Sequence, residues 1–351
     1  SVPGRLLYLL LCIALALAPS PAFCDDALPP GVDGGVKRGL DFLAQQQNAD
    51  GSFGAAQKPA ITGLALMAFL ASGHTPSAGK LDANIGKFGS NVRAAVDYLL
   101  SQAQADGSFG HNEKQMYGQA IATAALAEAY GVEDSQAQRK RIAAALANSV
   151  KVIVSAQEIH KTDVYAGGWR YETNAPDSDL SLSGWNVLAL RACQDVGIAV
   201  PKQAMQRAAK FVMKCYNPDA RAFAYQPGAA VTPSMTGVGV LCLHLLEADG
   251  KQPPEAAAAA AKTLAARPVD DASQFPYYAI YYAAQAAFQA GDPIWPAVSR
   301  MTAERLLKNQ QPDGGWPDAN AESGSAGRAY STSMALLTLS ISYRLLPVYQ
   351  R

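Results

Sequence analysis

Two aspartates, Asp177 and Asp179, stand directly before an apolar segment that begins at Leu180. Two carboxyl groups this close together can perform acid–base chemistry when burial keeps one of them protonated. The same residues also suit the start of a helix, where an Asp or Ser side chain accepts backbone N–H bonds and the helix dipole stabilises a carboxylate. Asp177 and Asp179 are therefore catalytic candidates, but capping of the helix by Asp179 or Ser181 is the favoured interpretation.

A run of tyrosines from Tyr277 to Tyr282 forms two i, i+4 pairs, so its rings cover adjacent faces of one helix. Such rings either line a cavity, which would bind a lipid or a sugar or stabilise a carbocation, or pack between helices. Packing is the favoured interpretation. The predicted ligand-binding residues are His111, Tyr117, Trp185, Tyr277, Tyr278, Tyr281 and Tyr330.

Residues that could hold a metal ion are not arranged to do so. Cys242 and His244 are two residues apart in a predicted helix, so they point to different faces. His74 follows a helix-terminating glycine and His160 lies in a polar loop. We expect no metal site and no cofactor.

These residues are positioned by a repeated helix–turn–helix unit. Three helical patterns end in Gln or Asn and are followed by an Asp-Gly turn and an aromatic residue, and Gly167-Gly168-Trp169 is a fourth such turn. Two weaker repeats fill the gap before the last one, which makes six units. The predicted structural residues of the repeat are Gln47, Gly51, Phe53, Gly107, Phe109, Gly167, Trp169, Gln310, Gly314 and Trp316.

Each unit is predicted to contain two helices. The first helix carries a single apolar stripe, such as Val36, Leu40 and Leu43, whereas the second is apolar on more than one side and fits an inner layer. The first helices are expected near residues 35, 91, 138, 202, 255 and 295, and the second helices near 60, 116, 180, 234, 275 and 329. No convincing alternating strand is present, so the fold is predicted to be all-α.

The repeats resemble the glutamine–tryptophan repeats of squalene–hopene cyclases and the related repeats of protein prenyltransferase β subunits. That pattern is a basic and a small residue, an aromatic–Leu pair, Gln, three residues, Gly, one residue and Trp. The first repeat matches it with Arg38, Gly39, Phe42, Leu43, Gln47, Gly51 and Phe53, and the second has Ala103 at the Gln position. The Gln can bond groups at a helix end and the Gly permits a turn with positive φ, so a structural role is favoured.

The resemblance implies an (α/α)6 toroid of six helical hairpins, in which inner helices line a cavity and their first residues converge at one end. Squalene–hopene cyclases use an Asp-x-Asp-Asp-Thr segment whose middle acid protonates an alkene. The corresponding stretch here is Asp177-Ser178-Asp179-Leu180-Ser181, with Leu180 at the third acidic position. The Asp-x-Cys zinc pair of the prenyltransferases has no counterpart in this chain.

The first residues are predicted to be an export signal. Residues 1–24 contain Arg5 and an apolar run that is shorter than the roughly 20 residues needed to cross a bilayer. An uncleaved anchor is the alternative. Residues 25–34 are expected to be a linker and 35–351 the toroid, with export to the periplasm, the cell envelope or the medium and no integral membrane span after cleavage. Cys193, Cys215 and Cys242 then allow at most one disulfide, whose pairing is open.

Composition limits the partners. The chain has 29 basic and 29 acidic residues among 351, so it offers no basic field for nucleic acid. Its 49% apolar and 17% charged residues exclude a disordered chain. A hydrophobic small molecule or a partner protein is expected.

Two functions compete. One is an exported cyclase-like protein whose central apolar cavity acts on or binds an isoprenoid or another hydrophobic ligand. The alternative is a non-catalytic periplasmic toroid that binds a lipid, a glycan or a partner protein. Other toroids that act on polysaccharides lack this repeat. The environment of Asp179 discriminates, because a proton donor needs a partner for its neutral form, whereas a cap accepts backbone N–H bonds.

Overall fold

The computed structural model describes residues 29–76, 87–110, 115–247, 255–266, 275–318 and 327–347. The predicted signal peptide, residues 25–28 of the predicted linker and His111 lie outside these residues.

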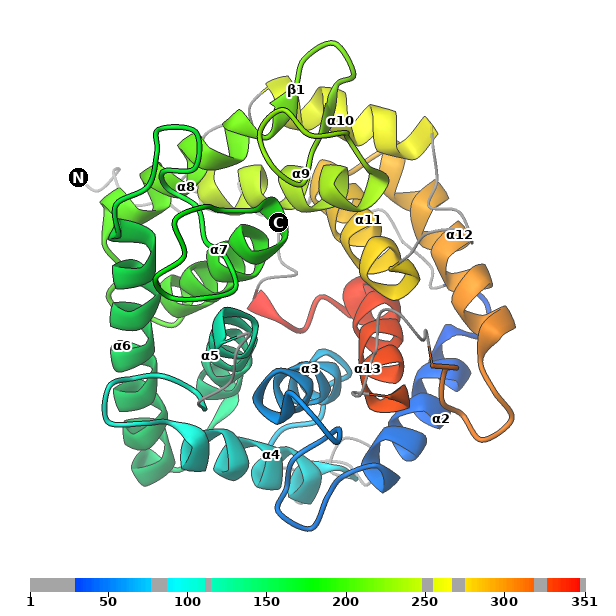
Figure 1. Ribbon diagram of the computed structural model, residues 1–351. Helices are drawn as coiled ribbons and strands as arrows, with labels where there is room; N and C mark the ends of the chain where they lie inside the picture. Colours follow the sequence, from blue (N-terminus) through cyan, green and yellow to red (C-terminus); the bar gives the residue numbers. More distant parts are fainter. Residues whose placement is uncertain are drawn as a thin grey trace, which may run out of the picture.

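The chain forms two concentric layers of helices that close into a ring (Figure 1). The outer helices are α2 (Val32–Gln45), α4 (Gly89–Gln102), α6 (Gln136–Glu158), α8 (Lys202–Lys214), α10 (Glu255–Ala266) and α12 (Ile294–Asn309). The inner helices are α3 (Lys58–Ala71), α5 (Gln115–Val132), α7 (Leu180–Asp195), α9 (Pro233–Glu247), α11 (Pro276–Ala290) and α13 (Arg328–Leu339), and η3 (Ser340–Tyr343) follows the last of them. Each inner helix packs on two inner neighbours, with α13 on α3. The predicted all-α toroid is confirmed.

Burial follows the predicted layers. On α2, the stripe of Val36, Leu40 and Leu43 is buried, whereas Lys37 and Arg38 on the opposite face are exposed. On α3, every residue from Pro59 to Ala71 is buried. An outer helix therefore covers the core with one face, and an inner helix is surrounded by neighbours. Among the described helices, none combines the length and the apolar character that crossing a membrane requires.

The repeat glycines allow two backbones to meet. Gly51 has φ 85° and ends the turn after α2. A Cβ atom at this position would lie 2.5 Å from the carbonyl oxygen of Ala94 on α4. Gly107, Gly167 and Gly314 have the same sign of φ and the same close approach to the next outer helix around the ring. Glycine is thus required both by the backbone conformation and by the contact.

The repeat glutamines bond the turn of their own repeat to the next outer helix around the ring. Nε2 of Gln310 donates to the carbonyl of Gly314 in its own turn (2.7 Å) and to the carbonyl of Gly35 on α2 (2.8 Å). This pair of bonds closes the ring, because it joins the last repeat to the first. Gln47 and Gln157 make the corresponding pairs of bonds in the first and third repeats. The bonded groups are carbonyls of the turn and of the next outer helix, rather than the free groups at a helix end that the sequence suggested.

The repeat aromatics are fully covered. Phe53, Phe109, Trp169 and Trp316 are all buried, and the two indole N–H groups donate to carbonyls of the preceding outer helix (2.7 Å each). The structural role predicted for the motif agrees with this geometry.

Two local features differ from the sequence expectations. Helix α2 begins at Val32, inside the segment predicted as linker. A short antiparallel hairpin of β1 (Tyr216–Asn217) and β2 (Ala222–Phe223) follows α8, where only a turn was expected. Strands of two residues are too short for an alternating pattern to show in the sequence.

Candidate functional site

The first turns of three inner helices meet through a chain of hydroxyl groups. Oγ of Ser181 on α7 lies 2.8 Å from the hydroxyl of Tyr117 on α5 and 2.8 Å from the hydroxyl of Tyr278 on α11. Helix α9 separates α7 from α11 in the ring, so the bond between Ser181 and Tyr278 spans more than one helix position. Both tyrosines are half-buried and keep some contact with solvent. The expected convergence of inner-helix starts is therefore present here.

Asp179 caps the helix that carries Ser181. Its Oδ1 accepts the backbone N–H of Leu182 at 2.8 Å, and its Oδ2 accepts from Nη1 of Arg170 at 2.6 Å. The side chain of Asp179 is fully buried. The favoured interpretation of Asp179 as a helix cap is confirmed.

The charge of this carboxyl group is balanced by Arg170. Burial raises the pKa of Asp179 above its ordinary value, while the N–H of Leu182 and the guanidinium of Arg170 oppose that rise. Burial likewise works against the charge of Arg170, but Asp179 outweighs it and the pKa of Arg170 is raised. Both oxygens of Asp179 are acceptors, so a proton on this group would have to displace one of these bonds.

Asp177 belongs to the same charged group. Its Oδ2 lies 3.1 Å from Nε of Arg170 and accepts from Nε2 of Gln226 at 3.1 Å. One guanidinium therefore bridges both predicted catalytic aspartates. Neither carboxylate is left without a donor.

Two tyrosines from loops hold the guanidinium in place. Arg170 lies over the rings of Tyr171, at 4.6 Å from the centroid, and Tyr225, at 5.5 Å. Its Nη1 also donates to the hydroxyl of Tyr225 at 2.5 Å, and the two tyrosine hydroxyls are 3.1 Å apart. The ring of Tyr171 lies 5.9 Å from that of Tyr117, which connects this group to the hydroxyl chain. We call Tyr117, Tyr171, Ser181, Tyr225 and Tyr278 the tyrosine–serine cluster.

A buried lysine ties the loop that carries Arg170. Nζ of Lys161 donates to the carbonyl of Gly168 (2.7 Å) and to Oγ of Ser178 (3.1 Å). Burial lowers the pKa of Lys161 to about 8, against the opposing charges of Asp177 and Asp179. The loop from Lys161 to Asp179 is thus fixed by internal bonds.

The hydroxyls of Tyr117, Tyr225 and Tyr278 remain protonated. Burial raises the pKa of Tyr117 and of Tyr278 well above the ordinary value, and burial also raises the pKa of Tyr225. A tyrosine whose pKa is raised keeps its proton near neutral pH, so its hydroxyl can donate one hydrogen bond and accept another. The arrangement suits recognition of oxygen atoms.

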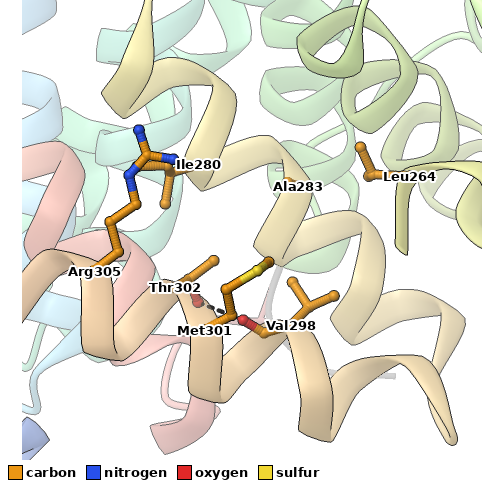
Figure 2. Close-up of a pocket in the computed structure, with 7 residues that line it drawn as sticks. All are labelled: Leu264, Ile280, Ala283, Val298, Met301, Thr302 and Arg305. Carbon is orange, nitrogen blue, oxygen red and sulfur yellow. Dashed lines mark hydrogen bonds between the residues drawn. The ribbon is translucent and has the colours of Figure 1, made fainter. Parts of the chain in front are cut away.

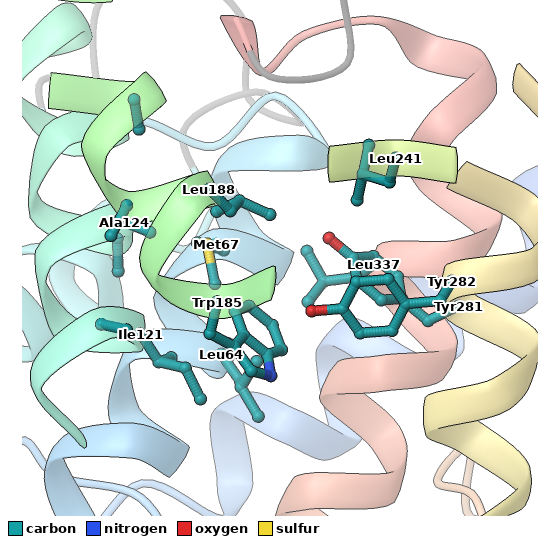
Figure 3. Close-up of a cluster of buried hydrophobic side chains, with 14 of the residues drawn as sticks. Leu64, Met67, Ile121, Ala124, Trp185, Leu188, Leu241, Tyr281, Tyr282 and Leu337 are labelled. Carbon is teal, nitrogen blue, oxygen red and sulfur yellow. The ribbon is translucent and has the colours of Figure 1, made fainter. Parts of the chain in front are cut away.

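Below the cluster, side chains from all six inner helices point toward the same central region (Figure 3). Trp185 stacks on Tyr281 with ring centroids 6.2 Å apart, and its edge meets Tyr282 at 5.8 Å. These three rings are 2%, 1% and 0% exposed. A cavity wide enough for a water molecule would leave part of their surface accessible. The expected apolar cavity is therefore not shown by these described residues, and for them packing explains the geometry.

The remaining predicted ligand-binding residues lie elsewhere. The hydroxyl of Tyr277 donates to the carbonyl of Pro317, which links α11 to the turn before α13. Tyr330 is half-buried at the start of α13. His111 lies outside the described residues.

A separate small pocket lies between α10, α11 and α12 (Figure 2). Its volume is about 30 Å³, and its lining is Leu264, Ile280, Ala283, Val298, Met301, Thr302 and Arg305. This volume matches about one water molecule, so the pocket is too small for an organic ligand.

Metal and thiol chemistry find little support. No group of three or more His, Cys, Asp or Glu residues suited to a metal ion occurs within the described ranges. Cys193, Cys215 and Cys242 are buried free thiols, so the disulfide that the sequence allowed is not formed. Burial raises the pKa of Cys193 and of Cys215 to about 12, which makes both thiols unreactive.

Sequence reasoning missed Arg170, Tyr171, Tyr225 and Lys161. Arg170 follows a repeat tryptophan and precedes two aspartates, which was a usable signal for an ion pair. Tyr225 follows the repeat aromatic Phe223 in the same way. Lys161 lies in a polar loop, and nothing in its neighbourhood distinguishes it from a solvated lysine.

Comparison with known proteins supports the fold. No family model matches the chain, and no curated protein matches it. Among solved structures, an inactive variant of an α-1,6-mannanase from Salegentibacter in complex with α-1,6-mannotriose is 13% identical with a TM-score of 0.63, covering 88% of this chain and 98% of that chain. Cellobiose 2-epimerase from Bacillus thermoamylovorans is 13% identical with a TM-score of 0.60, covering 88% and 98%.

The type II terpene cyclase MstE from Scytonema, in complex with geranylgeranyl dihydroxybenzoate, is 14% identical with a TM-score of 0.56, covering 90% of this chain and 98% of that chain. At these identities the shared feature is the α/α toroid. Type II terpene cyclases are among the proteins that share it, while membership of the squalene–hopene cyclase family itself is not confirmed.

Proposed function

We propose that this protein binds a neutral, hydroxyl-rich ligand of the oligosaccharide class at the tyrosine–serine cluster and performs no reaction on it. The observation that carries the proposal is the hydroxyl chain from Tyr117 through Ser181 to Tyr278, whose two tyrosines are half-buried and lie beside the ring of Tyr171. Sugars are recognised by flat aromatic faces together with hydroxyl donors and acceptors, and the cluster supplies both.

The charges of the site favour a neutral ligand. Two cations, Lys161 and Arg170, face two anions, Asp177 and Asp179, and Arg170 bonds both aspartates. An anionic ligand would have to compete with these carboxylates for the guanidinium. An uncharged polyol gains hydrogen bonds without breaking an ion pair.

We expect binding without catalysis because the carboxyl groups of Asp177 and Asp179 are already engaged by protein donors. A general acid or base needs a carboxyl group with a free position toward the ligand. Both oxygens of Asp179 accept protein donors, and Asp177 bonds Arg170 and Gln226. The tyrosines, with their raised pKa values, act as donors.

The toroid fold is compatible with such a ligand, since the mannanase of the same fold is in complex with mannotriose. Export to the periplasm, envelope or medium stays part of the proposal on the sequence pattern of residues 1–24. It agrees with a role in which the protein meets glycans outside the cytosol.

Binding of an isoprenoid is the second candidate. The aromatic rings at the ring axis, Trp185, Tyr281 and Tyr282, favour it, as does the terpene cyclase of the same fold. An isoprenoid would need these packed rings to separate, which costs buried apolar contact. For this reason the oligosaccharide is the first choice.

Isothermal titration calorimetry tests the proposal with three probes: α-1,6-mannotriose, cellobiose and geranylgeraniol. We expect saturable binding of at least one sugar. Ser181→Ala should weaken it about fivefold or more, because two tyrosine hydroxyls lose their shared partner. Ser155→Ala, at an exposed position on α6, is the matched control and should bind like wild type. Binding of geranylgeraniol alone would favour the second candidate, and binding of none of the three would reject both.

A further inference from the structure

The hydroxyl of Tyr282 is one of several buried polar side-chain atoms that make no hydrogen bond of ordinary geometry within the described residues. The side chain is 0% exposed. Burying a hydroxyl without a partner costs about 1–3 kcal/mol. Buried polar groups in proteins are nearly always bonded, so an exception requires an explanation.

Tyr282 lies one helical turn below the tyrosine–serine cluster. It follows Tyr278 by four residues on α11, and the two ring centroids are 4.6 Å apart. The hydroxyl of Tyr278 in turn lies 2.8 Å from Oγ of Ser181. Tyr282 therefore stands directly beneath the ring that forms one end of the hydroxyl chain.

The space around the hydroxyl is set by a glycine on the opposite helix. A Cβ atom on Gly184 of α7 would lie 3.8 Å from the hydroxyl of Tyr282 and 2.5 Å from Cγ1 of Val238. Gly184 follows Ser181 by three residues, so it belongs to the next level of the same helix face. The hydroxyl thus lies near Gly184, one level below Ser181, where Val238 and Cys242 of α9 also pack.

We propose that the hydroxyl of Tyr282 is the deepest contact of the oligosaccharide site and hydrogen-bonds an oxygen atom of the bound sugar. The ring of Tyr278 covers this position and has to shift for the sugar oxygen to reach it. The contact would distinguish ligands by whether they place an oxygen at this depth. A ligand with only an apolar group at this position would leave the Tyr282 hydroxyl without a hydrogen bond of ordinary geometry. This inference rests on the proposed function and adds a specificity-determining residue to it.

The explanation has one competitor, a single buried water molecule. A water needs two or more polar partners, so it would have to bond a second group as well as the hydroxyl of Tyr282. Both explanations supply a bond to Tyr282, but only the sugar contact makes ligand affinity depend on it.

Tyr282→Phe is the test, because it removes one oxygen atom and preserves the ring. The probe is whichever of α-1,6-mannotriose and cellobiose binds wild-type protein more tightly, measured by calorimetry. We expect the dissociation constant to rise about five- to tenfold, as for loss of one hydrogen bond. The melting temperature should change little, because the hydroxyl makes no hydrogen bond of ordinary geometry with the described residues of the free protein and its nearest polar neighbour is the hydroxyl-bearing ring of Tyr278. Tyr98→Phe, a buried tyrosine on α4, is the matched control and should leave the dissociation constant unchanged.

The outcomes separate the two proposals. Wild-type binding that persists unchanged in Tyr282→Phe overturns the inference and leaves the proposed function standing. Wild-type protein that binds neither sugar overturns both. A crystal structure of the complex adds a direct reading: a sugar oxygen within hydrogen-bond distance of the Tyr282 hydroxyl supports the inference, and a water molecule in that place contradicts it.

Discussion

Nε2 of Gln119 on α5 donates at 3.0 Å to the carbonyl of Gly107, which lies in the turn after α4. In the first, third and last repeats, the corresponding glycine carbonyl is bonded by a glutamine from the end of the outer helix. The second repeat has Ala103 at that place, and the inner helix α5 provides the amide instead. All four repeats therefore have a glutamine side chain that donates to the carbonyl of the turn glycine. The position of that glutamine differs in the second repeat.

Gln119→Leu should destabilise the protein strongly. The amide of Gln119 also accepts from the backbone N–H of Phe109 (3.0 Å) and donates to Oγ of Ser149 (2.6 Å), so its loss leaves buried polar groups without partners. We expect the free energy of unfolding in urea to fall by roughly 3 kcal/mol. Gln102→Ala, at the neighbouring surface, should have little effect.

Ala103→Gln should recover part of this loss in the Gln119→Leu background, because it restores the glutamine of the other repeats. Equal stability of the single and double variants would contradict the idea that the two positions serve one junction.

Gly51→Ala should lower the free energy of unfolding by more than the positive φ of this residue alone explains. Its methyl group would lie 2.5 Å from the carbonyl oxygen of Ala94. Gly228→Ala is the matched control, since Gly228 also has positive φ (80°) but nothing lies within 4 Å of its Cβ position. We expect about 1–2 kcal/mol at Gly228 for the left-handed backbone and a clearly larger loss at Gly51. Equal losses at the two sites, measured by urea denaturation, would show that the contact between helices is not tight.

Asp179→Asn should destabilise more than Asp177→Asn. The asparagine can still cap α7, but Arg170 loses its buried ionic partner. Breaking a buried pair costs about 3 kcal/mol or more, whereas a partly exposed pair is worth about 0–1 kcal/mol. The side chain of Asp177 is 33% exposed, so its ion pair with Arg170 is a partly exposed one and its loss should cost about 0–1 kcal/mol. A larger loss at Asp177 than at Asp179, measured by denaturation, would contradict this ranking.

Lys161 should make stability depend on pH in the alkaline range. Burial lowers its pKa in the folded protein to about 8, below its ordinary value of 10.5. Between these values the unfolded chain binds more protons at this residue, so the contribution of Lys161 to the free energy of unfolding should rise with pH from about 8 to 10, against the opposite contribution of the buried thiols Cys193 and Cys215. Below pH 8 both states are protonated and the burial penalty is fully present.

Lys161→Met should remove this rise, whereas Lys151→Met, at an exposed position on α6, should retain it. The comparison requires denaturation at several pH values from 7 to 10. A parallel dependence in wild type and Lys161→Met would exclude the buried lysine as its source.

The sequence was sufficient for the architecture because the signals for it are local. The inner helices begin at or within two residues of the predicted positions, as at Leu180, since turn glycines and apolar periodicity mark those boundaries. The meeting of Tyr117 with Ser181 followed from the expected convergence of inner-helix starts. The bridge from Arg170 to both aspartates depends on how loops fold over one another, and no local pattern encodes that.

The centre of the ring is the part of the fold for which the sequence left two interpretations open. Whether rings such as Trp185 and Tyr281 line a cavity or fill it depends on the diameter of the inner layer and on side-chain rotamers. A periodic apolar pattern is the same in both cases. The structure brings these rings into contact, so recognition is placed at the polar end of the axis in the proposed function.

The most direct test of the central proposal is a crystal structure of the protein with α-1,6-mannotriose or cellobiose bound. The account predicts a sugar ring against Tyr117 or Tyr171, with sugar oxygens within hydrogen-bond distance of Ser181 and Tyr278, while the ion pair of Arg170 and Asp179 stays intact. A sugar bound elsewhere on the ring, or at the cluster only after Arg170 leaves Asp179, would contradict it.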